Sequence, residues 1–315
     1  MKYVFFDIEC ACVYKNTAKM CAFGYVVTDG KFQVIEREDI LLNPKGKFHL
    51  TDRKGREGLV LPYEYEDFKK YPVFSAEYQR IKALLEDKDA VVLGHATVND
   101  VNYLNLETRR YKLQPLHFAF YDTQFFYMNV TGNYARQYGL GAMAEELGVE
   151  FTPHRAVDDA YATMCACRAI CEREKTDVHG LVSRYAIRAG RAGGGNITPL
   201  SSAGQSRYFA QREKEKEIRA RAHEQFYRVV NRNLNKKRKG RLSGKVFCFA
   251  KEIEEDLPNS VNLVSAIFEA GGTYTSHPAE CNVYIACEED GVRYRNAVLS
   301  GAAVIPLSLL AEALK

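Results

Sequence analysis

Three segments rich in Val, Ile, Phe and Tyr open the chain and restrict the folds that it can adopt. They cover residues 2–9, 21–29 and 32–43, and Thr28-Asp29-Gly30 between the last two is typical of a tight turn. Because β-branched and aromatic residues favour strands, the chain is expected to begin with an antiparallel meander of three strands.

Strands and helices then alternate up to about residue 174. The pattern of apolar residues predicts helices over 74–87, 98–111 and 156–174, and strands at 90–95 and near 117–124. Three strands followed by strand–helix alternation imply an α/β fold, in which helices pack on the faces of a mixed sheet.

The second half of the chain has a different organisation. Residues 189–206 are rich in Gly, Ser and Pro and are predicted to end the first domain. A long charged helix is expected over 207–234, and from residue 244 a strand–helix pair occurs three times. The predicted domains are therefore 1–188 and 244–315, joined by a linker and basic helix over 189–243.

One apolar seam runs along the expected charged helix, at every fourth residue. Its members are Ile218, Ala222, Phe226, Val230 and Leu234. Around this seam the helix is basic, since residues 205–245 hold fourteen Lys or Arg and four Glu in a chain of net charge +4.

This local excess of positive charge suggests a polyanionic partner. The expected nucleic-acid contacts are Arg219, Arg221, Lys236, Lys237, Arg238 and Lys239. The alternative is a solvated connector helix, which needs no partner.

The sequence gives no sign of export or membrane insertion. No stretch approaches about 18 apolar residues, and Asp7 interrupts the N-terminal apolar run too early for a secretory signal. The nine cysteines have no framework spacing and are expected to be reduced, mostly as small buried hydrophobic residues. These features predict a cytoplasmic protein without a membrane partner.

Two carboxylates, Asp7 and Glu9, stand at the end of the first apolar segment. Residues i and i+2 of a strand point to the same face, so both side chains are expected to aim together. Two neighbouring carboxylates repel each other unless one keeps its proton, and a divalent cation removes that conflict. The alternative is a solvated strand end.

Further acids are available to complete such a site. Asp100 opens the helix that follows the strand at 90–95, while His154, Asp158 and Asp159 lie at the start of the helix over 156–174. Carboxylate oxygens are the ligands that Mg²⁺ and Mn²⁺ prefer. An imidazole can act as a base near neutral pH.

At these residues the sequence resembles the DEDDh family of 3′–5′ exonucleases, which includes the proofreading epsilon subunit of bacterial DNA polymerase III, the Trex-like nucleases and oligoribonuclease. The motif F-D-x-E-T reads Phe6-Asp7-Ile8-Glu9-Cys10 here, G-H-N-x-x-x-D begins at Gly94, and H-x-A-x-x-D-A begins at His154. The three motifs occur in order within residues 1–175. This resemblance implies a ribonuclease H-like mixed sheet with flanking helices.

The resemblance also implies two Mg²⁺ or Mn²⁺ ions that clamp the scissile phosphate and stabilise charge on the attacking and leaving oxygens. The implied ligands are Asp7, Glu9, Asp100 and Asp159. It assigns His154 as the general base, and it favours Asp159 over Asp158 because the family places its Asp five residues after the His. The products would be nucleoside monophosphates released from a 3′ end.

Two positions depart from the family motifs. Cys10 stands where relatives have a Thr beside the terminal nucleotide, and Ala96 replaces an Asn. Neither change removes a metal ligand, so both concern the fit of the substrate. The expected substrate contacts are Ile8, Cys10 and His95, and the alternative for His95 is a histidine that is solvated or hydrogen-bonded in the core. Asp122 is interpreted as a supporting or structural residue.

The C-terminal segment resembles a BRCT domain. The resemblance rests on the opening strand GKVFCFA, the pair Gly271-Gly272, the strand NVYIA and the helix–strand–helix ending. The chain has no Trp, and Ala250-Lys251 stand where phosphopeptide-binding members have Ser or Thr. Docking to DNA ends or to a protein partner is therefore expected, and phosphopeptide recognition is not.

Together these features predict a metal-dependent 3′–5′ exonuclease that acts on DNA, single-stranded or at 3′ ends, in repair or replication. One alternative is a ribonuclease of the same mechanism, because the motifs do not separate DNA from RNA. Another is a scaffold that docks nucleic acid or protein without cutting. The scaffold is disfavoured because no metal-binding acid is missing.

Overall fold

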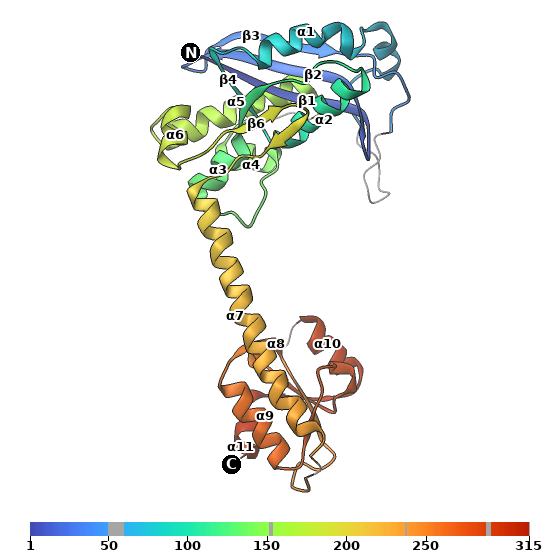
Figure 1. Cartoon of the computed structure of the whole chain (residues 1–315), viewed down its shortest axis with the longest axis vertical. Helices are drawn as coiled ribbons and strands as arrows, with labels where there is room; N and C mark the ends of the chain where they lie inside the picture. Colours follow the sequence, from blue (N-terminus) through green and yellow to red (C-terminus); the bar gives the residue numbers. More distant parts are fainter. Residues whose placement is uncertain (50–59, 151–153, 237, 288–290, 315) are drawn as a thin grey trace. The chain divides into compact units, whose positions relative to one another are not determined.

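The computed structural model describes residues 1–49, 60–150, 154–236, 238–287 and 291–314. The chain divides into two compact units, Met1–Tyr208 and Phe209–Lys315. Figure 1 shows the secondary structure of each unit, and each is described here by itself.

The first unit is built on a seven-stranded sheet with the order β3-β2-β1-β4-β5-β6-β7. The strands are β1 (Lys2–Tyr14), β2 (Thr17–Asp29), β3 (Val34–Leu41), β4 (Ala90–Gly94), β5 (Phe118–Asp122), β6 (Gly190–Gly193) and β7 (Asn196–Thr198). β1, β4 and β5 run parallel, whereas β1–β2–β3 and β5–β6–β7 are antiparallel. The predicted meander and mixed sheet are confirmed.

Helices cover both faces of this sheet. They are η1 (Tyr65–Lys70), α1 (Phe74–Leu85), α2 (Val98–Arg110), α3 (Thr123–Thr131), α4 (Leu140–Leu147), α5 (Ala156–Arg173) and α6 (Val178–Arg184). Arg80 of α1 donates a hydrogen bond to the Tyr25 hydroxyl, while the adjacent Gly24 lies against Ala156 of α5. Since neighbouring residues of a strand face opposite ways, α1 and α5 lie on opposite faces (Figure 1).

The segment predicted as a linker contributes to the sheet. β6 and β7 form a short hairpin within residues 189–206, and β6 pairs with β5. Gly190 packs so closely on Phe120 that an added Cβ would come within 2.5 Å of the ring. The glycines that suggested a linker are thus required, in part, by close packing at the edge of the first unit.

The second unit contains a four-stranded parallel sheet with the order β11-β10-β8-β9. The strands are β8 (Val246–Phe249), β9 (Thr273–Tyr274), β10 (Val283–Ala286) and β11 (Ala303–Pro306), and the helices are α8 (Lys251–Glu255), α9 (Asn259–Glu269), η2 (Pro278–Glu280), α10 (Gly291–Leu299) and α11 (Leu307–Leu314). The structure confirms a small C-terminal α/β unit and adds the short elements β9 and α8.

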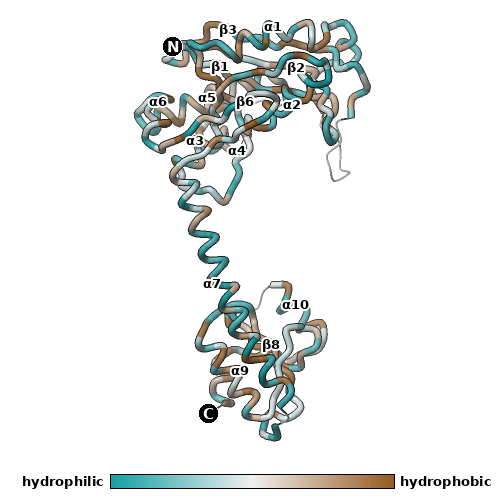
Figure 2. The backbone as a smooth tube through the Cα atoms, in the orientation of Figure 1, coloured by the Kyte–Doolittle hydropathy of each residue, from teal (hydrophilic) through white to brown (hydrophobic). Residues whose placement is uncertain are grey.

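The long helix α7 (Ala203–Leu234) supplies part of the second unit's core. Ala222, Phe226 and Val230 are buried, and the Phe226 ring packs against those of Phe249 and Tyr274. Figure 2 shows that most of α7 is otherwise hydrophilic. The second unit therefore begins in this helix and not at residue 244, because side chains of α7 complete its core.

The two ends of the predicted apolar seam differ from its centre, since Ile218 and Leu234 are exposed.

None of the helices in the described ranges combines the length and the apolar content needed to cross a bilayer.

Candidate metal and active site

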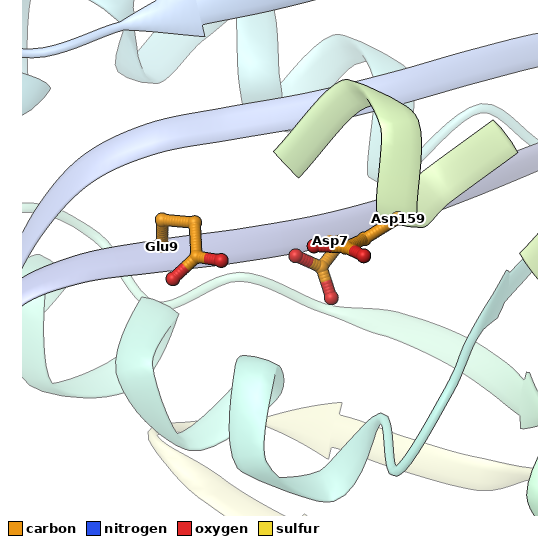
Figure 3. Close-up of side chains that lie close together, drawn as sticks. All are labelled: Asp7, Glu9 and Asp159. Atoms are coloured by element: carbon orange, nitrogen blue, oxygen red, sulfur yellow. The ribbon is translucent and has the colours of Figure 1, made fainter. Parts of the chain in front are cut away.

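The site begins with strand β1, which presents Asp7 and Glu9 on one face of the sheet. Phe6 and Ile8, which alternate with them, are buried in the hydrophobic core. Asp159 approaches the same place from the first turn of α5. One carboxylate oxygen from each of the three acids lies within 4.8 Å of the others. Figure 3 shows these three side chains close together.

The position of Asp159 depends on the turn before α5. The His154 backbone N–H donates a hydrogen bond of 3.1 Å to Asp159 Oδ2. Asp158 instead forms ion pairs with Arg37 and Arg155. The structure thus separates these adjacent acids, with Asp159 in the carboxylate cluster and Asp158 bound to arginines.

Asp100 reaches the site from the first turn of α2. It is 5% exposed, and burial raises its pKa well above the usual value, while the backbone of Ile8, between Asp7 and Glu9 on β1, acts in the opposite direction. Its charge contributes to the raised pKa of Asp7. Asp100 therefore belongs to the same electrostatic environment, although it is not one of the three acids within 4.8 Å.

These four acids are held at a high electrostatic cost. Burial, followed by repulsion from Asp100 and the neighbouring acids, raises the pKa of Asp7 well above its usual value. Burial and the charge of Asp159 raise the pKa of Glu9 to about 8, and burial raises that of Asp159 to about 7. A divalent cation would remove this repulsion, so the oxygen-rich donor set fits Mg²⁺ or Mn²⁺.

Comparison with known protein families agrees with this geometry. The family model described as Exonuclease (RNase T) matches residues 4–166, slightly more than half of the chain. The chain belongs to the exonuclease family. The predicted enzyme class, an exonuclease that hydrolyses phosphodiester bonds, is confirmed. A search of curated proteins found no match to the sequence.

A solved structure shows the same fold at low sequence identity. A 3′-exonuclease solved for its 3′-end-specific recognition of a histone mRNA stem-loop aligns with a TM-score of 0.50 and 13% identity, over 64% of this chain and 90% of that chain. Exonuclease I of E. coli with an oligonucleotide aligns with a TM-score of 0.43 and 16% identity, over 58% of this chain and 42% of that chain. The large mixed sheet is that of a ribonuclease H-like exonuclease domain.

An acid on β3 that the motifs did not identify also lies near the cluster. Asp39 on β3 lies opposite Gly24 on β2, which in turn lies opposite Asp7 on β1. The Asp39 side chain is 8% exposed, and its charge raises the pKa values of Asp7, Glu9 and Asp159. The alternation of β3 alone did not distinguish Asp39, because its position depends on the register of three strands.

Among the predicted substrate contacts, the side chains of Ile8 and His95 contact other residues of the exonuclease domain. The Ile8 side chain is in the core. His95 Nδ1 lies 3.1 Å from Thr123 Oγ1, and Nε2 lies 2.8 Å from the Tyr138 carbonyl oxygen. Burial lowers the pKa of His95. Both ring nitrogens of this histidine therefore have partners in the exonuclease domain.

Cys10 occupies an irregular point of the sheet. It is half-buried, and the pairing of β1 with β2 changes register on both sides of it. Glu107 of α2 accepts a hydrogen bond of 2.9 Å from the Met20 N–H opposite Cys10. This buried glutamate, which the sequence reasoning did not single out, supports the irregular strand pair beside the acids.

The predicted general base and Asp122 have different surroundings. His154 is exposed, with a backbone φ of 76°. Asp122 is buried and caps α3 by accepting a hydrogen bond from the Phe125 N–H, while its other oxygen accepts one from the Thr97 N–H. These bonds make Asp122 a structural residue that joins the starts of α2 and α3.

Proposed function

We propose that this exonuclease removes nucleotides from the 3′ ends of DNA by metal-dependent hydrolysis. The observation that carries the proposal is the close approach of Asp7, Glu9 and Asp159, whose oxygens lie within 4.8 Å at a partly buried and electrostatically costly site. Two divalent ions, when bound, supply positive charge that stabilises the attacking and leaving oxygens of a phosphodiester.

The side chains of the site have different roles in this proposal. Asp7, Glu9, Asp159 and Asp100 hold the ions. The exposed imidazole of His154 takes a proton from the attacking water, and the His154 backbone orients Asp159 through its hydrogen bond. Cys10, half-buried beside Glu9, contacts the terminal nucleotide.

DNA is preferred to RNA in this proposal because of the second unit. Its strand–helix order and the conformation of Gly271, with a φ of 86° at the end of α9, support the resemblance to a BRCT domain. We assign it a docking role toward DNA ends or a protein in repair or replication. RNA is the substrate to test in parallel, because the 3′-exonuclease with a similar fold was solved for its recognition of a histone mRNA stem-loop.

Basic residues of the second unit are proposed to contact the phosphate backbone. Arg221, Lys236 and Lys239 are exposed, whereas Arg219 pairs with Glu255 and Arg238 with Glu269. Lys237, predicted to contact nucleic acid, lies outside the described residues. An exposed and unevenly basic segment of this kind favours binding that weakens steeply with salt.

The test uses 5′-labelled single-stranded DNA, duplex DNA and single-stranded RNA of one sequence, each with Mg²⁺, Mn²⁺ or EDTA. We expect stepwise shortening of DNA from the 3′ end that requires the metal. Shortening of RNA alone would replace DNA by RNA in the proposal. Cleavage in EDTA would contradict the mechanism, and no cleavage of any substrate would favour the scaffold.

Two adjacent aspartates provide the matched control. Asp159→Asn removes a charge from the cluster and is expected to abolish cleavage. Asp158→Asn changes the neighbouring acid, which pairs with Arg37 and Arg155, and should retain most of the activity. Equal activity of the two variants would contradict the assignment of Asp159 as a metal ligand.

A further inference from the structure

The start of α5 is attached to the sheet by a tyrosine outside the three exonuclease motifs. The Tyr63 hydroxyl donates a hydrogen bond of 2.9 Å to Asp39 Oδ2 on β3. The same hydroxyl accepts a hydrogen bond of 3.0 Å from the Ala156 N–H, at the first residue of α5. Tyr63 thus links an edge of the meander to the helix that carries Asp159.

The first amides of a helix have no partner within the helix and need one elsewhere. At Ala156 this need is strict, because the backbone there is pressed against Gly24 of β2. Ala156 and Val157 are buried. The Tyr63 oxygen therefore satisfies a buried donor at the point where α5 meets the sheet.

Asp39 is in turn held where it can orient the Tyr63 hydroxyl. Its Oδ2 accepts the Tyr63 hydrogen bond and lies 3.5 Å from Arg155 Nε. Its Oδ1 is buried and has no hydrogen-bond partner among the described residues. Because the Asp39 side chain is only 8% exposed, it depends on protein groups for its hydrogen bonds. The Tyr63 O–H therefore points to Asp39, and the lone pairs of the Tyr63 oxygen remain available to accept the hydrogen bond from the Ala156 N–H.

Arg155 and Asp158 make a second connection between the same elements. Asp158 of α5 pairs with Arg37 of β3, and Arg155 bridges Asp158 and Asp39. These contacts are partly exposed, so each contributes little by itself. The connection through Tyr63 is partly buried and consists of hydrogen bonds, so it is the more directional of the two.

We infer that Asp39 and Tyr63 are positioning residues for the metal centre, which fix the first turn of α5 so that Asp159 meets Asp7 and Glu9. This inference rests on the proposed function, because it concerns the geometry of the proposed metal ligands. Tyr63 and Asp39 touch neither metal nor substrate in this assignment. Tyr63 acts through Ala156 and the turn that contains His154 and Asp159, and Asp39 acts through Tyr63 in addition to the repulsion of its charge on the cluster acids.

Tyr63→Phe tests the inference, because it removes the hydroxyl and leaves the ring in its packing against Phe68. Loss of an outer hydrogen bond of a metal site typically costs about 10–100-fold in affinity or activity. We expect Mn²⁺ binding, measured by titration calorimetry, to weaken by about tenfold or more, with a similar fall in kcat and an unchanged KM for DNA.

Tyr65→Phe is the matched control. Its hydroxyl accepts a hydrogen bond from the Leu61 N–H in the same segment and, among the described residues, forms none with α5. It should bind Mn²⁺ like the unaltered protein. A Tyr63→Phe protein with unchanged Mn²⁺ affinity and kcat, or a Tyr65→Phe protein with the same loss, would overturn the inference.

Asp39→Asn provides a second route to the same test. If Asp39 acts through Tyr63, the losses of Asp39→Asn and Tyr63→Phe should be strongly non-additive in the double variant. Additive losses would overturn the link between them. An unaltered protein that neither binds Mn²⁺ nor cuts DNA or RNA would contradict the proposed function itself. That outcome differs from the one that overturns the present inference, in which the unaltered protein is active and Tyr63→Phe is equally active.

Discussion

Gly24 of β2 lies directly against the backbone of Ala156 at the start of α5. A Cβ added at Gly24 would come within 2.1 Å of the Ala156 carbonyl carbon and the Val157 nitrogen. Both obstructing atoms belong to backbone, so a flexible side chain cannot move aside to make room. The absence of a side chain at position 24 thus allows the helix bearing Asp159 to reach the strand bearing Asp7.

Gly24→Ala is therefore expected to displace the start of α5 and to abolish metal-dependent cleavage. Overpacking of this kind typically lowers the free energy of unfolding by about 1–3 kcal/mol. Thermal melts and Mn²⁺ titrations measure the two effects. The control is Gly30→Ala, where the nearest atom to the added Cβ is 3.9 Å away. Equal behaviour of the two variants would contradict the role of the Gly24 contact.

The sequence predicted the cluster acids better than their supports, for a physical reason. Period-two alternation places Asp7 and Glu9 on one face whatever the partner strand is. Gly24 and Asp39, in contrast, meet Asp7 only through the register of three strands. Tyr63 depends on a segment with little periodicity, so no local pattern relates it to Ala156.

The domain boundaries, like the residues that support the cluster, depend on packing that no local sequence pattern reveals. Gly-rich residues 189–206 favour a linker by composition, yet the β6–β7 hairpin places them at the sheet edge through pairing with β5. The helical seam containing Phe226 was visible in the sequence, but the surface that it covers was not. Tertiary packing decides both outcomes.

Asp122 should contribute to stability and not to metal binding. Asp122→Ala leaves the Phe125 and Thr97 amides without their buried acceptor, and we expect the free energy of unfolding to fall by about 1–3 kcal/mol. Asp177→Ala, which removes an exposed cap bonded to the Gly180 N–H, should cost about 1 kcal/mol or less. Denaturant titrations measure both, and Mn²⁺ affinity of the folded Asp122→Ala protein should persist. A selective loss of that affinity would contradict a purely structural role.

The stability of the metal-free protein should fall as the pH rises. The pKa values of Glu9 and Asp159 are raised to about 8 and about 7, so these groups hold protons more tightly in the folded than in the unfolded chain. Their favourable contribution is complete below their unfolded pKa values, near pH 4, and is lost as the pH rises through 7 and 8. Mg²⁺ prefers the deprotonated carboxylates and should reverse this trend.

Thermal melts at pH 6 and pH 8, in EDTA and in Mg²⁺, test this prediction. In EDTA the melting temperature should be lower at pH 8, and Mg²⁺ should raise it more at pH 8 than at pH 6. Glu9→Gln removes one of the titrating groups and should flatten the dependence in EDTA. A Glu9→Gln protein with the same pH dependence as the unaltered chain would show that other groups determine the trend.

The second unit should require the C-terminal half of α7 for folding. Phe226 is fully buried there, and the Tyr227 hydroxyl donates a hydrogen bond of 3.1 Å to the buried Glu254. Loss of a buried Phe side chain costs about 3–5 kcal/mol, which approaches the whole stability of a domain of about 70 residues. A fragment over 209–315 should therefore melt cooperatively, whereas one over 244–315 should not.

Within the longer fragment, Phe226→Ala should lower the melting temperature strongly and Ile218→Ala, at a position 66% exposed, should leave it nearly unchanged. Cooperative melting of both fragments at the same temperature would show that α7 is dispensable to this core.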